Sequence, residues 1–532
     1  MSASPSIARL LRYWHTLRWL RPVQFTGRAW HRLHRPRPDL RPAPPLALPP
    51  GRWLACARTP SLVAPETFRF LSVARRIEAP ADWNRADWPK LWLYNAHYFD
   101  DLAADDAAAR TDWHRALIAR WIAENPPGQG NGWEPYPTSL RIVNWLKWLM
   151  AGHAPVPGML DSLAVQVRWL RGRLEHHLLG NHLWANAKAL VFAGTCFAGL
   201  EAARWRREGL WLLDREVREQ VLADGGHFER SPMYHAILTE DLLDLLQVAQ
   251  AANVLSHDDL VAWRRTAIRM LDWAGAMAHP DGDVAFFNDA AFGIAAPLPA
   301  LQAYAQALGV KLPPPATPGL RLLDASGYAR LQAGPALLLA DVAPVGPDYL
   351  PGHAHADTLS FELSLQGHRV LVNGGTSTYE NDAERQRQRG TAAHNTVVVD
   401  GQDSSEVWSA FRVARRARVH GVQAERQGAA LRLSAWHDGY LRLPGRVRHR
   451  RSWQLSAQAL VVEDVLEGHY REAEAHFLFA PDAASTVRWQ VDGGEARMED
   501  AVWCPRFGEA QPACKLVVRF LQPRCTVTFH WD

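Results

Sequence analysis

Cysteine is scarce in this chain, with five residues among 532. No two of them are spaced as Cys-x-x-Cys, and an odd number of cysteines cannot all pair. The pattern therefore indicates neither a disulfide framework nor a cysteine zinc site. A protein of a reducing compartment is the simpler interpretation.

Long apolar runs are also missing, since no segment has the roughly 20 uninterrupted apolar residues that span a bilayer. Residues 1–25 are rich in Leu and Trp, but Arg9, Arg12, Arg18 and Arg21 interrupt any signal-peptide core. We expect a basic amphipathic helix there, which packs on its own protein or lies on a membrane surface. The expected location is cytoplasmic or membrane-peripheral, with the periplasm as the alternative.

A strong excess of either charge is absent, because 59 Lys and Arg stand against 55 Asp and Glu, for a net charge of +4. Such a balance allows an acidic ligand without requiring one. There is no basic run with interleaved aromatic residues, so no nucleic-acid partner is expected. The content of 48% hydrophobic and 21% charged residues is that of a globular rather than a disordered protein.

The length is sufficient for two or three domains. Proline-rich breaks at residues 35–50 and 312–319 divide the chain, since proline cannot continue a helix. We expect a basic N-terminal arm and linker over residues 1–50, a helical domain over 51–312 and a β domain over 320–532. No pattern in the sequence indicates an oligomeric state.

The middle region follows a helical period. Apolar residues surround segment 140–150 nearly completely, 165–179 is amphipathic, and 237–254 repeats apolar residues at three- and four-residue steps. Small residues dominate 182–200, which predicts an inner helix that its neighbours approach closely. Most of the 24 tryptophans lie in such helical segments, so core packing is expected more often than stacking on a sugar ring.

After residue 319 the period changes to two. Apolar and polar residues alternate over 359–365 and over 525–531, as they do in half-buried strands. Many short strands of this kind, separated by glycine-rich and charged turns, indicate antiparallel sheets packed as a sandwich.

A histidine cluster precedes one of these strands. His353 and His355 are two residues apart, and side chains at i and i+2 of an extended chain point to the same side. A third histidine, His394, comes before the strand-like run 397–399. These rings could bind a metal or transfer protons, and the alternative is a set of hydrogen-bonded surface histidines.

Polar residues also gather at predicted helix starts. Asn181 is either the cap of the small-residue helix or, together with His182, part of an anion site in its first turn. The loop 224–235 is denser in ionisable groups than a mere connection needs. Within it, Tyr234 is either a reactive phenol or a packed aromatic side chain. Glu134 with Asp224 or Asp289 could instead form the carboxylate pair of an inverting glycosidase.

Five motifs follow one another along roughly residues 90–420: Trp133–Pro137, Gly180–His182, Asp224–His235, Gly352–Asp357 and Ala393–Thr396. In this order they resemble the heparinase II/III family of polysaccharide lyases. The resemblance implies an N-terminal (α/α) toroid, an incomplete α/α barrel, followed by a C-terminal antiparallel β-sandwich. It also implies cleavage of a uronic-acid polysaccharide by β-elimination, as in the heparin, heparan sulfate and alginate lyases of the family.

The resemblance implies catalytic roles for four residues. Tyr234 would protonate the leaving oxygen and could also be a base, and His353 would be the partner base or charge stabiliser. Asn181 and His182 would neutralise the uronate carboxylate, whose charge opposes loss of the proton on C5. A tyrosine base must ionise far below its usual pKa of about 10, so groups that lower the pKa of Tyr234 are expected beside it.

Further residues are expected to bind substrate or metal. The substrate-binding candidates are Glu134, Tyr136, Arg230 and His235; Arg230 and His235 could also lower the pKa of Tyr234. The resemblance implies a structural divalent ion, zinc or calcium, held by His355, Asn373 and His394. Asn373 stands where the family has an aspartate, and because a neutral amide is the weaker ligand, metal affinity is expected to fall.

The leading prediction is a polysaccharide lyase, a carbon–oxygen lyase whose partner is an acidic polysaccharide. Two other classes remain open: an inverting glycoside hydrolase, and a non-lytic glycan-binding protein of exopolysaccharide production.

Overall fold

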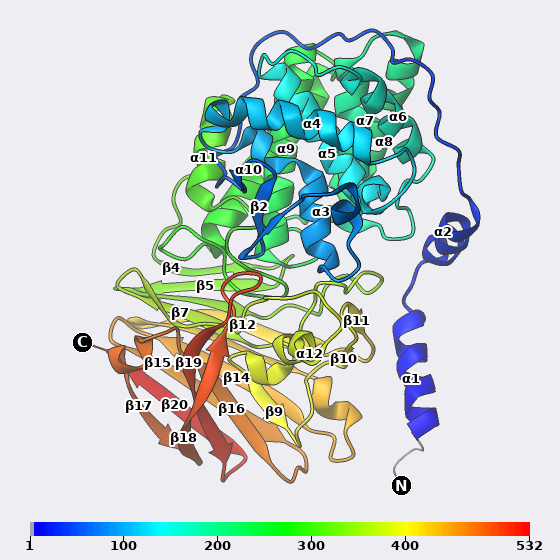
Figure 1. Cartoon of the computed structure of the whole chain (residues 1–532). Coiled ribbons are helices and arrows are strands. Elements are labelled where there is room, and N and C mark those ends of the chain that lie inside the picture. Colours follow the sequence, from blue (N-terminus) through cyan, green and yellow to red (C-terminus); the bar gives the residue numbers. More distant parts are fainter. Residues whose placement is uncertain (1–4, 532) are drawn as a thin grey trace.

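The computed structural model describes residues 5–531. Helices make up most of the N-terminal part and antiparallel sheets the C-terminal part, and Figure 1 shows the two parts stacked on each other. The predicted order of a helical toroid and a β-sandwich is confirmed.

The helical part is a layer of inner helices backed by outer ones. The α-helices are α1 (Pro5–Leu17), α2 (Pro22–Leu33), α3 (Lys90–Tyr98), α4 (Thr111–Glu124), α5 (Pro135–Met150), α6 (Met159–Arg171), α7 (Gly180–Cys196), α8 (Gly199–Gln220), α9 (Pro232–Ala252), α10 (His257–Met277), α11 (Leu298–Ala307) and α12 (Ala383–Arg389). Helices α3, α5, α7 and α9 are neighbours in that order, and α6, α8 and α10 pack behind them. Among the helices described, none combines the length and apolarity that crossing a bilayer requires.

Helix α7 is the inner helix that the small residues predicted. All of its residues except His182 are buried. Helix α8 approaches it closely because Gly209 has no side chain: a Cβ there would lie 2.8 Å from the carbonyl oxygen of Ala187. The segment 140–150 belongs to α5 and is likewise almost wholly buried, whereas α6 ends at Arg171, before the amphipathic segment does.

One part of the region expected to be helical forms a small sheet instead. Strands β1 (Leu62–Ala64), β2 (Thr67–Phe70) and β3 (Val73–Arg76) pair antiparallel. The ring of Phe70 lies 5.3 Å from that of Trp92 in α3, so the sheet covers an aromatic part of the helical core. Strands this short contain too few residues for their period to be recognised in sequence.

The C-terminal part has three main sheets, and every pairing between its named strands is antiparallel. A six-stranded sheet has the order β12-β13-β14-β15-β20-β17, and β5 of the five-stranded sheet β4-β5-β6-β7-β8 packs on its strands β13 and β14. The four-stranded sheet β18-β19-β16-β9 continues from the five-stranded one through a bridge between Leu371 and Phe479. The two layers share one apolar core.

The strand bounds are β4 (Gly319–Leu323), β5 (Tyr328–Ala333), β6 (Ala336–Asp341), β7 (Phe361–Leu365), β8 (His368–Leu371), β9 (Val397–Val399), β10 (Val407–Trp408), β11 (Arg412–Val413), β12 (Val419–Gln427), β13 (Ala430–His437), β14 (Arg448–Leu455), β15 (Ala459–Glu467), β16 (Ala473–Leu478), β17 (Arg488–Asp492), β18 (Gly494–Trp503), β19 (Gln511–Phe520) and β20 (Arg524–His530). Strand β20 alternates between buried and more exposed residues, as predicted for 525–531.

Strand β7 is fully buried, so the prediction of a half-buried strand was wrong. Its polar face packs against the helical part rather than water. His279, just after α10, hydrogen-bonds through Nε2 to Glu362 at 2.9 Å and through Nδ1 to Ser364 at 2.7 Å. The alternation therefore predicted correctly which residues share a face of the strand. The polar face, however, is covered by the helical domain and not by water.

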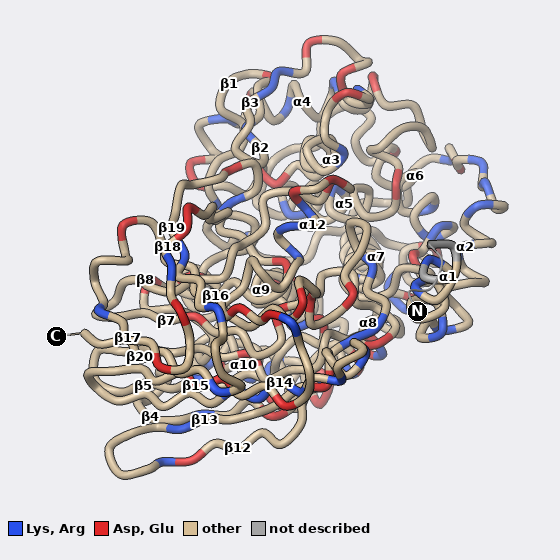
Figure 2. Tube along the Cα trace, turned by 90° about the horizontal axis from the view of Figure 1, so that it is seen from below, with Lys and Arg blue, Asp and Glu red and all other residues tan. Residues whose placement is uncertain are grey.

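The chain before residue 34 forms two helices, α1 and α2, where a single helix over residues 1–25 was predicted; residues 1–4 lie outside the described part. Figures 1 and 2 both show α1 and α2 along one edge of the molecule. Residues 35–45 then run without regular structure, as the prolines predicted. The two helices touch both the helical and the sheet part, as described below.

Candidate functional site

The first turns of successive inner helices carry most of the candidate residues. Tyr136 lies in the first turn of α5, Asn181 and His182 in that of α7, and Tyr234 in that of α9. The rings of Tyr136 and His182 are 4.6 Å apart, so the starts of α5 and α7 meet. Motifs separated by about a hundred residues therefore come together at one end of the toroid, facing the sandwich.

The starts of these helices differ in how they are capped. In α9, Ser231 is the N-cap, and its hydroxyl accepts a hydrogen bond from the backbone of Tyr234 at 3.2 Å. In α7 the N-cap is Leu179, so the interpretation of Asn181 as a cap was wrong. Gly180 has φ +54°, and a Cβ there would lie 2.8 Å from a carboxylate oxygen of Glu229. A glycine therefore lets Glu229 reach the start of α7.

Backbone strain gathers around the same residues. Leu179, Arg230, Asn288 and Leu359 all have positive φ, at 64°, 59°, 56° and 61°. Such conformations are uncommon outside glycine and persist where the surrounding structure imposes them, often at functional sites. Each of them lies within six residues of Asn181, Tyr234, Asp289 or His353.

Tyr234 is buried where the helical and sheet parts meet. Its ring stacks on His353 with centroids 3.9 Å apart, and its hydroxyl lies 3.2 Å from that of Tyr379. Burial, together with nearby tyrosine and aspartate oxygens, holds the pKa of Tyr234 well above its usual value. The lowered pKa expected for a tyrosine base is therefore not found, and the phenol is protonated at neutral pH.

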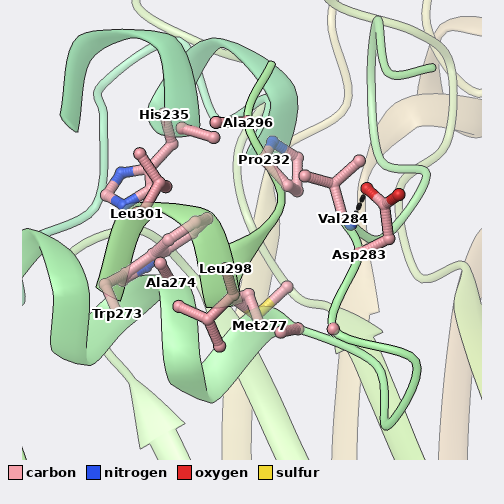
Figure 3. Close-up of a pocket in the computed structure, with 13 residues that line it drawn as sticks. Pro232, His235, Trp273, Ala274, Met277, Asp283, Val284, Ala296, Leu298 and Leu301 are labelled. Atoms are coloured by element: carbon pink, nitrogen blue, oxygen red, sulfur yellow. Dashed lines mark hydrogen bonds between the residues drawn. The ribbon is translucent and has the colours of Figure 1, made fainter. Parts of the chain in front are cut away.

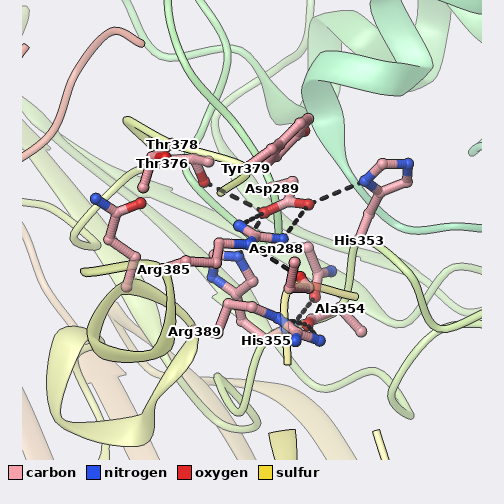
Figure 4. Close-up of polar contacts among 12 residues, drawn as sticks. Asn288, Asp289, His353, Ala354, His355, Thr376, Thr378, Tyr379, Arg385 and Arg389 are labelled. Carbon is pink, nitrogen blue, oxygen red and sulfur yellow. Dashed lines mark hydrogen bonds and ion pairs between the residues drawn. The ribbon is translucent and has the colours of Figure 1, made fainter. Parts of the chain in front are cut away.

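Asp289 lies at the centre of the polar contacts behind His353 (Figure 4). Arg385 of α12 makes two hydrogen bonds to its carboxylate. His353 Nδ1 bonds one oxygen at 2.9 Å and His355 Nε2 the other at 2.8 Å. Burial alone would raise the pKa of Asp289, but Arg385 and the two histidines hold it well below its usual range.

This network fixes the tautomer of His353. Because Asp289 is ionised, its oxygens can only accept hydrogen bonds, so Nδ1 of His353 carries the hydrogen. The lone pair of a neutral ring then lies on Nε2, which is 3.6 Å from a carboxylate oxygen of Glu229. The contact is too long for a hydrogen bond. His353 thus has a nitrogen free to accept a proton, and a buried carboxylate to stabilise the resulting cation.

Glu229 is a residue that the sequence motif contained but did not single out. It is buried, and its Oε1 has no hydrogen-bond partner among the described residues. Burial raises the pKa of Glu229, and His353 and the backbone of Asn181 offset part of that rise. The residue therefore links the start of α7 to His353.

His182 pairs with a second carboxylate. Its Nδ1 lies 3.1 Å from Glu175, and its side chain is 32% exposed. Burial alone would lower the pKa of His182, but Glu175, Glu229 and Glu134 raise it. Asn181, beside it, is buried and hydrogen-bonds with Tyr136. A ring whose charged form Glu175 favours and an amide therefore stand together at the start of α7.

Of the four residues predicted to bind substrate, only Tyr136 contacts a predicted catalytic side chain among the described residues. Tyr136 adjoins His182, whereas Glu134 pairs with Lys90 at 2.9 Å and hydrogen-bonds the hydroxyl of Tyr94. Arg230 donates through Nε to the carbonyl of Ser326 at 2.9 Å, in the turn between β4 and β5. Arg230 is therefore held by the sandwich.

His235 points away from Tyr234. Its Nε2 lies 2.9 Å from the carbonyl of Met270, and its ring packs at 4.2 Å on Trp273 of α10. Figure 3 shows it in a largely apolar pocket between α9, α10 and the loop after them. Burial lowers the pKa of His235 to about 4, so the ring is neutral at pH 7 and brings no positive charge to Tyr234.

The residues predicted to hold a metal supply two imidazoles. His355 Nδ1 lies 3.2 Å from His394 Nε2, and burial lowers the pKa of each to about 4. The amide of Asn373 is used elsewhere, since its oxygen accepts from the backbone of Asn395 at 3.1 Å. Among the described residues no three His, Cys, Asp or Glu side chains are grouped to hold a metal ion. Two neighbouring imidazoles are therefore present, and the amide oxygen of Asn373 already accepts one hydrogen bond.

Besides Glu229, three residues of the site were not predicted in their present roles: Tyr379, Arg385 and Asp289. Tyr379 and Arg385 follow β8 in irregular chain and a short helix, where no period or motif points to them. Asp289 was considered only as a glycosidase carboxylate. Its neighbour Asn288 could have been a signal: the side-chain Oδ1 of Asn288 accepts from the backbone N–H of His355 at 3.0 Å, which connects this loop to the histidine motif.

Comparison with known proteins agrees with this architecture. Residues 153–307 match the heparinase II/III N-terminus family and residues 315–532 the heparinase II/III-like C-terminal family. A heparin-sulfate lyase of Pedobacter heparinus is 28% identical over 53% of this chain and 47% of its own length. One of Bacteroides thetaiotaomicron is 25% identical over 59% of this chain and 51% of its own. The chain thus spans about half the length of these relatives.

Solved structures share the fold at lower identity. The crystal structure of heparinase III superposes with a TM-score of 0.66 at 18% identity, covering 84% of this chain and 79% of that one. Heparan sulfate lyase HepC from Pedobacter heparinus has a TM-score of 0.57 at 17% identity, covering 96% and 87%. The two family matches leave only residues 308–314 uncovered from residue 153 onward. The chain belongs to the heparinase II/III-like family.

Proposed function

We propose that this protein is a polysaccharide lyase that cleaves a uronate-containing acidic polysaccharide by β-elimination. The observation that carries the proposal is the pairing of Tyr234, a protonated phenol, with His353, whose Nε2 is free and whose Nδ1 is held by Asp289. The pair supplies a proton donor and a proton acceptor side by side, as an elimination requires.

The first requirement of the reaction is to make the C5 proton acidic. A uronate carboxylate opposes carbanion formation at C5 until donors neutralise it. His182, whose charged form Glu175 favours, and Asn181 are the donors at the start of α7. The backbone of Asn181 lies close enough to Glu229 to lower the pKa of that carboxyl, so we assign the binding of the uronate carboxylate to the two side chains.

The elimination then needs two proton transfers, one from C5 and one to the leaving oxygen. Nε2 of His353 takes the C5 proton, and the electrons of that C–H bond form the C4=C5 double bond as the C4–O bond breaks. Tyr234 gives its phenolic proton to the departing glycosidic oxygen and becomes a phenolate. Asp289 stabilises the imidazolium that forms, and return of the proton from His353 to Tyr234 restores the starting state.

The substrate class is inferred from charge and from relatives. Both relatives compared above are named heparin-sulfate lyases, and heparan sulfate is an acidic polysaccharide. The donors His182 and Asn181 suit an anionic group rather than a neutral sugar. We therefore propose an acidic polysaccharide as the substrate.

A hydrolytic alternative is less well supported. Asp289 is buried and fully used by Arg385, His353 and His355, and its low pKa prevents it from donating a proton. Asp224 is bound to the backbone and hydroxyl of Ser326, both at 2.8 Å. Neither carboxylate is free to be the partner of Glu134.

The ion that the family resemblance implies stays a prediction, and no step above uses it. Elemental analysis of protein purified without chelator tests it directly. A stoichiometric metal that the double variant His355→Ala/His394→Ala lacks would place the ion at these histidines. Metal-free protein that is folded and active would show that the fold does not need it.

Tyr234→Phe tests the proposed function. We expect kcat to fall by roughly 10²- to 10⁴-fold, the usual contribution of a positioned acid, while the fold is kept. Tyr379→Phe is the comparison: it removes only the hydrogen bond to Tyr234, so a loss of no more than about tenfold is expected. Unchanged circular dichroism with near-normal turnover by Tyr234→Phe would contradict the assignment.

A further inference from the structure

The outward face of the first two helices is apolar and meets solvent. We call residues 5–33, which hold α1 and α2, the arm. In α1 the exposed large side chains recur at three- and four-residue steps: Ile7, Leu10, Leu11, Trp14 and Leu17. Leu10 is 69% and Trp14 62% exposed. A surface helix normally packs such an apolar stripe against the core of its own protein. In α1 the stripe faces solvent, so it does not contribute to the core.

The second helix continues the feature. Its exposed apolar side chains are Val23, Phe25, Trp30 and Leu33, the last two at 62% and 81%. Of the 21 large apolar side chains that are exposed in the described part of the chain, nine lie in the arm. This concentration marks an interaction surface rather than the scattered exposure of any soluble protein.

The inward face of the arm is already occupied. Tyr13 packs edge-on against Trp408 with ring centroids 5.0 Å apart, and Trp408 donates to the hydroxyl of Thr16 at 3.1 Å. Farther along, Gln24 donates to the carbonyl of Tyr349 at 3.1 Å, and the rings of His31 and His177 are 4.5 Å apart. These contacts attach the arm to both the sandwich and the toroid. The arm is therefore docked on the protein, and its apolar stripe faces outward in that docked position.

The charge of the arm identifies what would cover it. Residues 1–38 contain eight arginines and no Asp or Glu, although the whole chain has a net charge of only +4. All eight are exposed: Arg9, Arg12, Arg18, Arg21, Arg28, Arg32, Arg35 and Arg37. Figure 2 shows α1 and α2 at one edge, with basic segments along them.

A stripe of Leu and Trp flanked by arginines is the pattern of a helix that lies in the plane of a membrane surface. Leucine and tryptophan enter the boundary between headgroups and acyl chains, and arginines bind anionic headgroups. We propose that the arm docks on an anionic lipid bilayer, with the outer faces of α1 and α2 inserted side by side. This surface is separate from the Tyr234 site and does not depend on the proposed lyase activity.

Vesicle flotation of the full-length protein tests the proposal. The probes are vesicles of phosphatidylcholine alone and of phosphatidylcholine mixed with phosphatidylglycerol. We expect binding only to the mixture, and weaker binding at high salt because surface charges are then screened. The double variant Leu10→Gln/Trp14→Gln should lose roughly tenfold or more in vesicle affinity, since it removes two large apolar side chains from the stripe.

Trp489→Gln is the matched control, because Trp489 is another exposed tryptophan, 38% exposed on β17, and Figures 1 and 2 both show β17 on the opposite side of the molecule from α1. It should bind vesicles like the unaltered protein. The proposal is overturned by three results: no flotation with the anionic vesicles, equal flotation with both kinds, or equal loss in the control. It is also overturned if sedimentation without vesicles shows a dimer that Leu10→Gln/Trp14→Gln abolishes, since a second copy would then cover the stripe.

Discussion

Individual charges in the site are set by their buried neighbours. Tyr234 is kept protonated by burial, while Asp289 is kept ionised by Arg385 and two histidines. His182 is held toward its charged form by Glu175. The site thus contains a proton donor, a proton acceptor and a ring whose charged form is favoured, and buried neighbours maintain each of these states.

The pair His182 and Glu175 predicts a pH dependence. Because Glu175 raises the pKa of His182, the alkaline fall in kcat/KM assigned to His182 should lie above the pKa of an unperturbed histidine. In Glu175→Gln that fall should move to lower pH, with activity at acidic pH less affected. In His182→Gln the donor no longer titrates, so this limb should vanish. An identical pH–rate profile in all three proteins would refute the role of His182.

The same pair also makes the stability of the fold depend on pH. The raised pKa of His182 stabilises the fold at pH values below that of an unfolded histidine, and this contribution is lost as the pH rises through the raised value. Burial alone would raise the pKa of Glu175, but His182 and Asn186 lower it, so its contribution is lost as the pH falls. The pair is therefore most stabilising between the two unfolded values, at weakly acidic pH.

At the scale of elements, the site depends on where inner helices begin. Helices α5, α7 and α9 each place a candidate residue in the first turn, and their close packing sets the distances between those turns. The packing of α7 against α8 relies on glycine, since a Cβ on Gly209 would meet backbone atoms of Ala187 and Val191 at 2.8 Å.

Gly209→Ala should therefore destabilise the protein, by about 1–3 kcal/mol, because two buried helices must move apart. Gly275→Ala in α10 is the matched control: its Cβ would meet nothing within 4 Å. There the gain in helix propensity should stabilise by roughly 0.5–1 kcal/mol. The free energy of unfolding of both variants is measured with urea. Equal effects of the same sign would show that the close contact of α7 with α8 does not determine the effect of Gly209→Ala.

The sequence was sufficient for elements with a clear period and for motifs with a fixed order. Small residues predicted α7, alternation predicted β20, and five motifs led to Tyr234 and His353. It could not show that the polar face of β7 would be buried, because its partner His279 is more than eighty positions away. Tyr379 and Arg385 were missed for the same reason, since their role exists only through contacts with Tyr234 and Asp289.

For the whole molecule, the two parts are joined by buried polar contacts. His279 of the helical part binds Glu362 and Ser364 of β7, and all three side chains are buried. Asp289, in the loop between α10 and α11, binds His353 and His355 of the sandwich part. The site is built across this junction, so its geometry requires both parts to be docked.

His279→Leu should weaken the junction strongly. It removes one hydrogen bond to Glu362, which keeps two from the backbones of Phe286 and Asn373, and one to Ser364, and each buried group left short of a partner costs about 1–3 kcal/mol. Ser364→Ala removes one hydrogen bond and should cost only about 1 kcal/mol. Calorimetry is expected to show one unfolding transition for Ser364→Ala and two for His279→Leu, with activity lost before the second. A single unshifted transition in His279→Leu would mean that this contact does not couple the two parts.

Elimination at a uronate leaves a C4=C5 double bond beside the carboxylate, and the ultraviolet absorbance of this unsaturated product measures the reaction most directly. The purified protein is incubated with heparan sulfate, alginate, hyaluronan and bacterial acidic exopolysaccharides, with Tyr234→Phe run beside it. We predict a rise in absorbance with at least one polymer and none with the variant. Chain shortening without that rise would contradict elimination and favour hydrolysis, and saturable binding without shortening would favour a non-lytic glycan-binding protein.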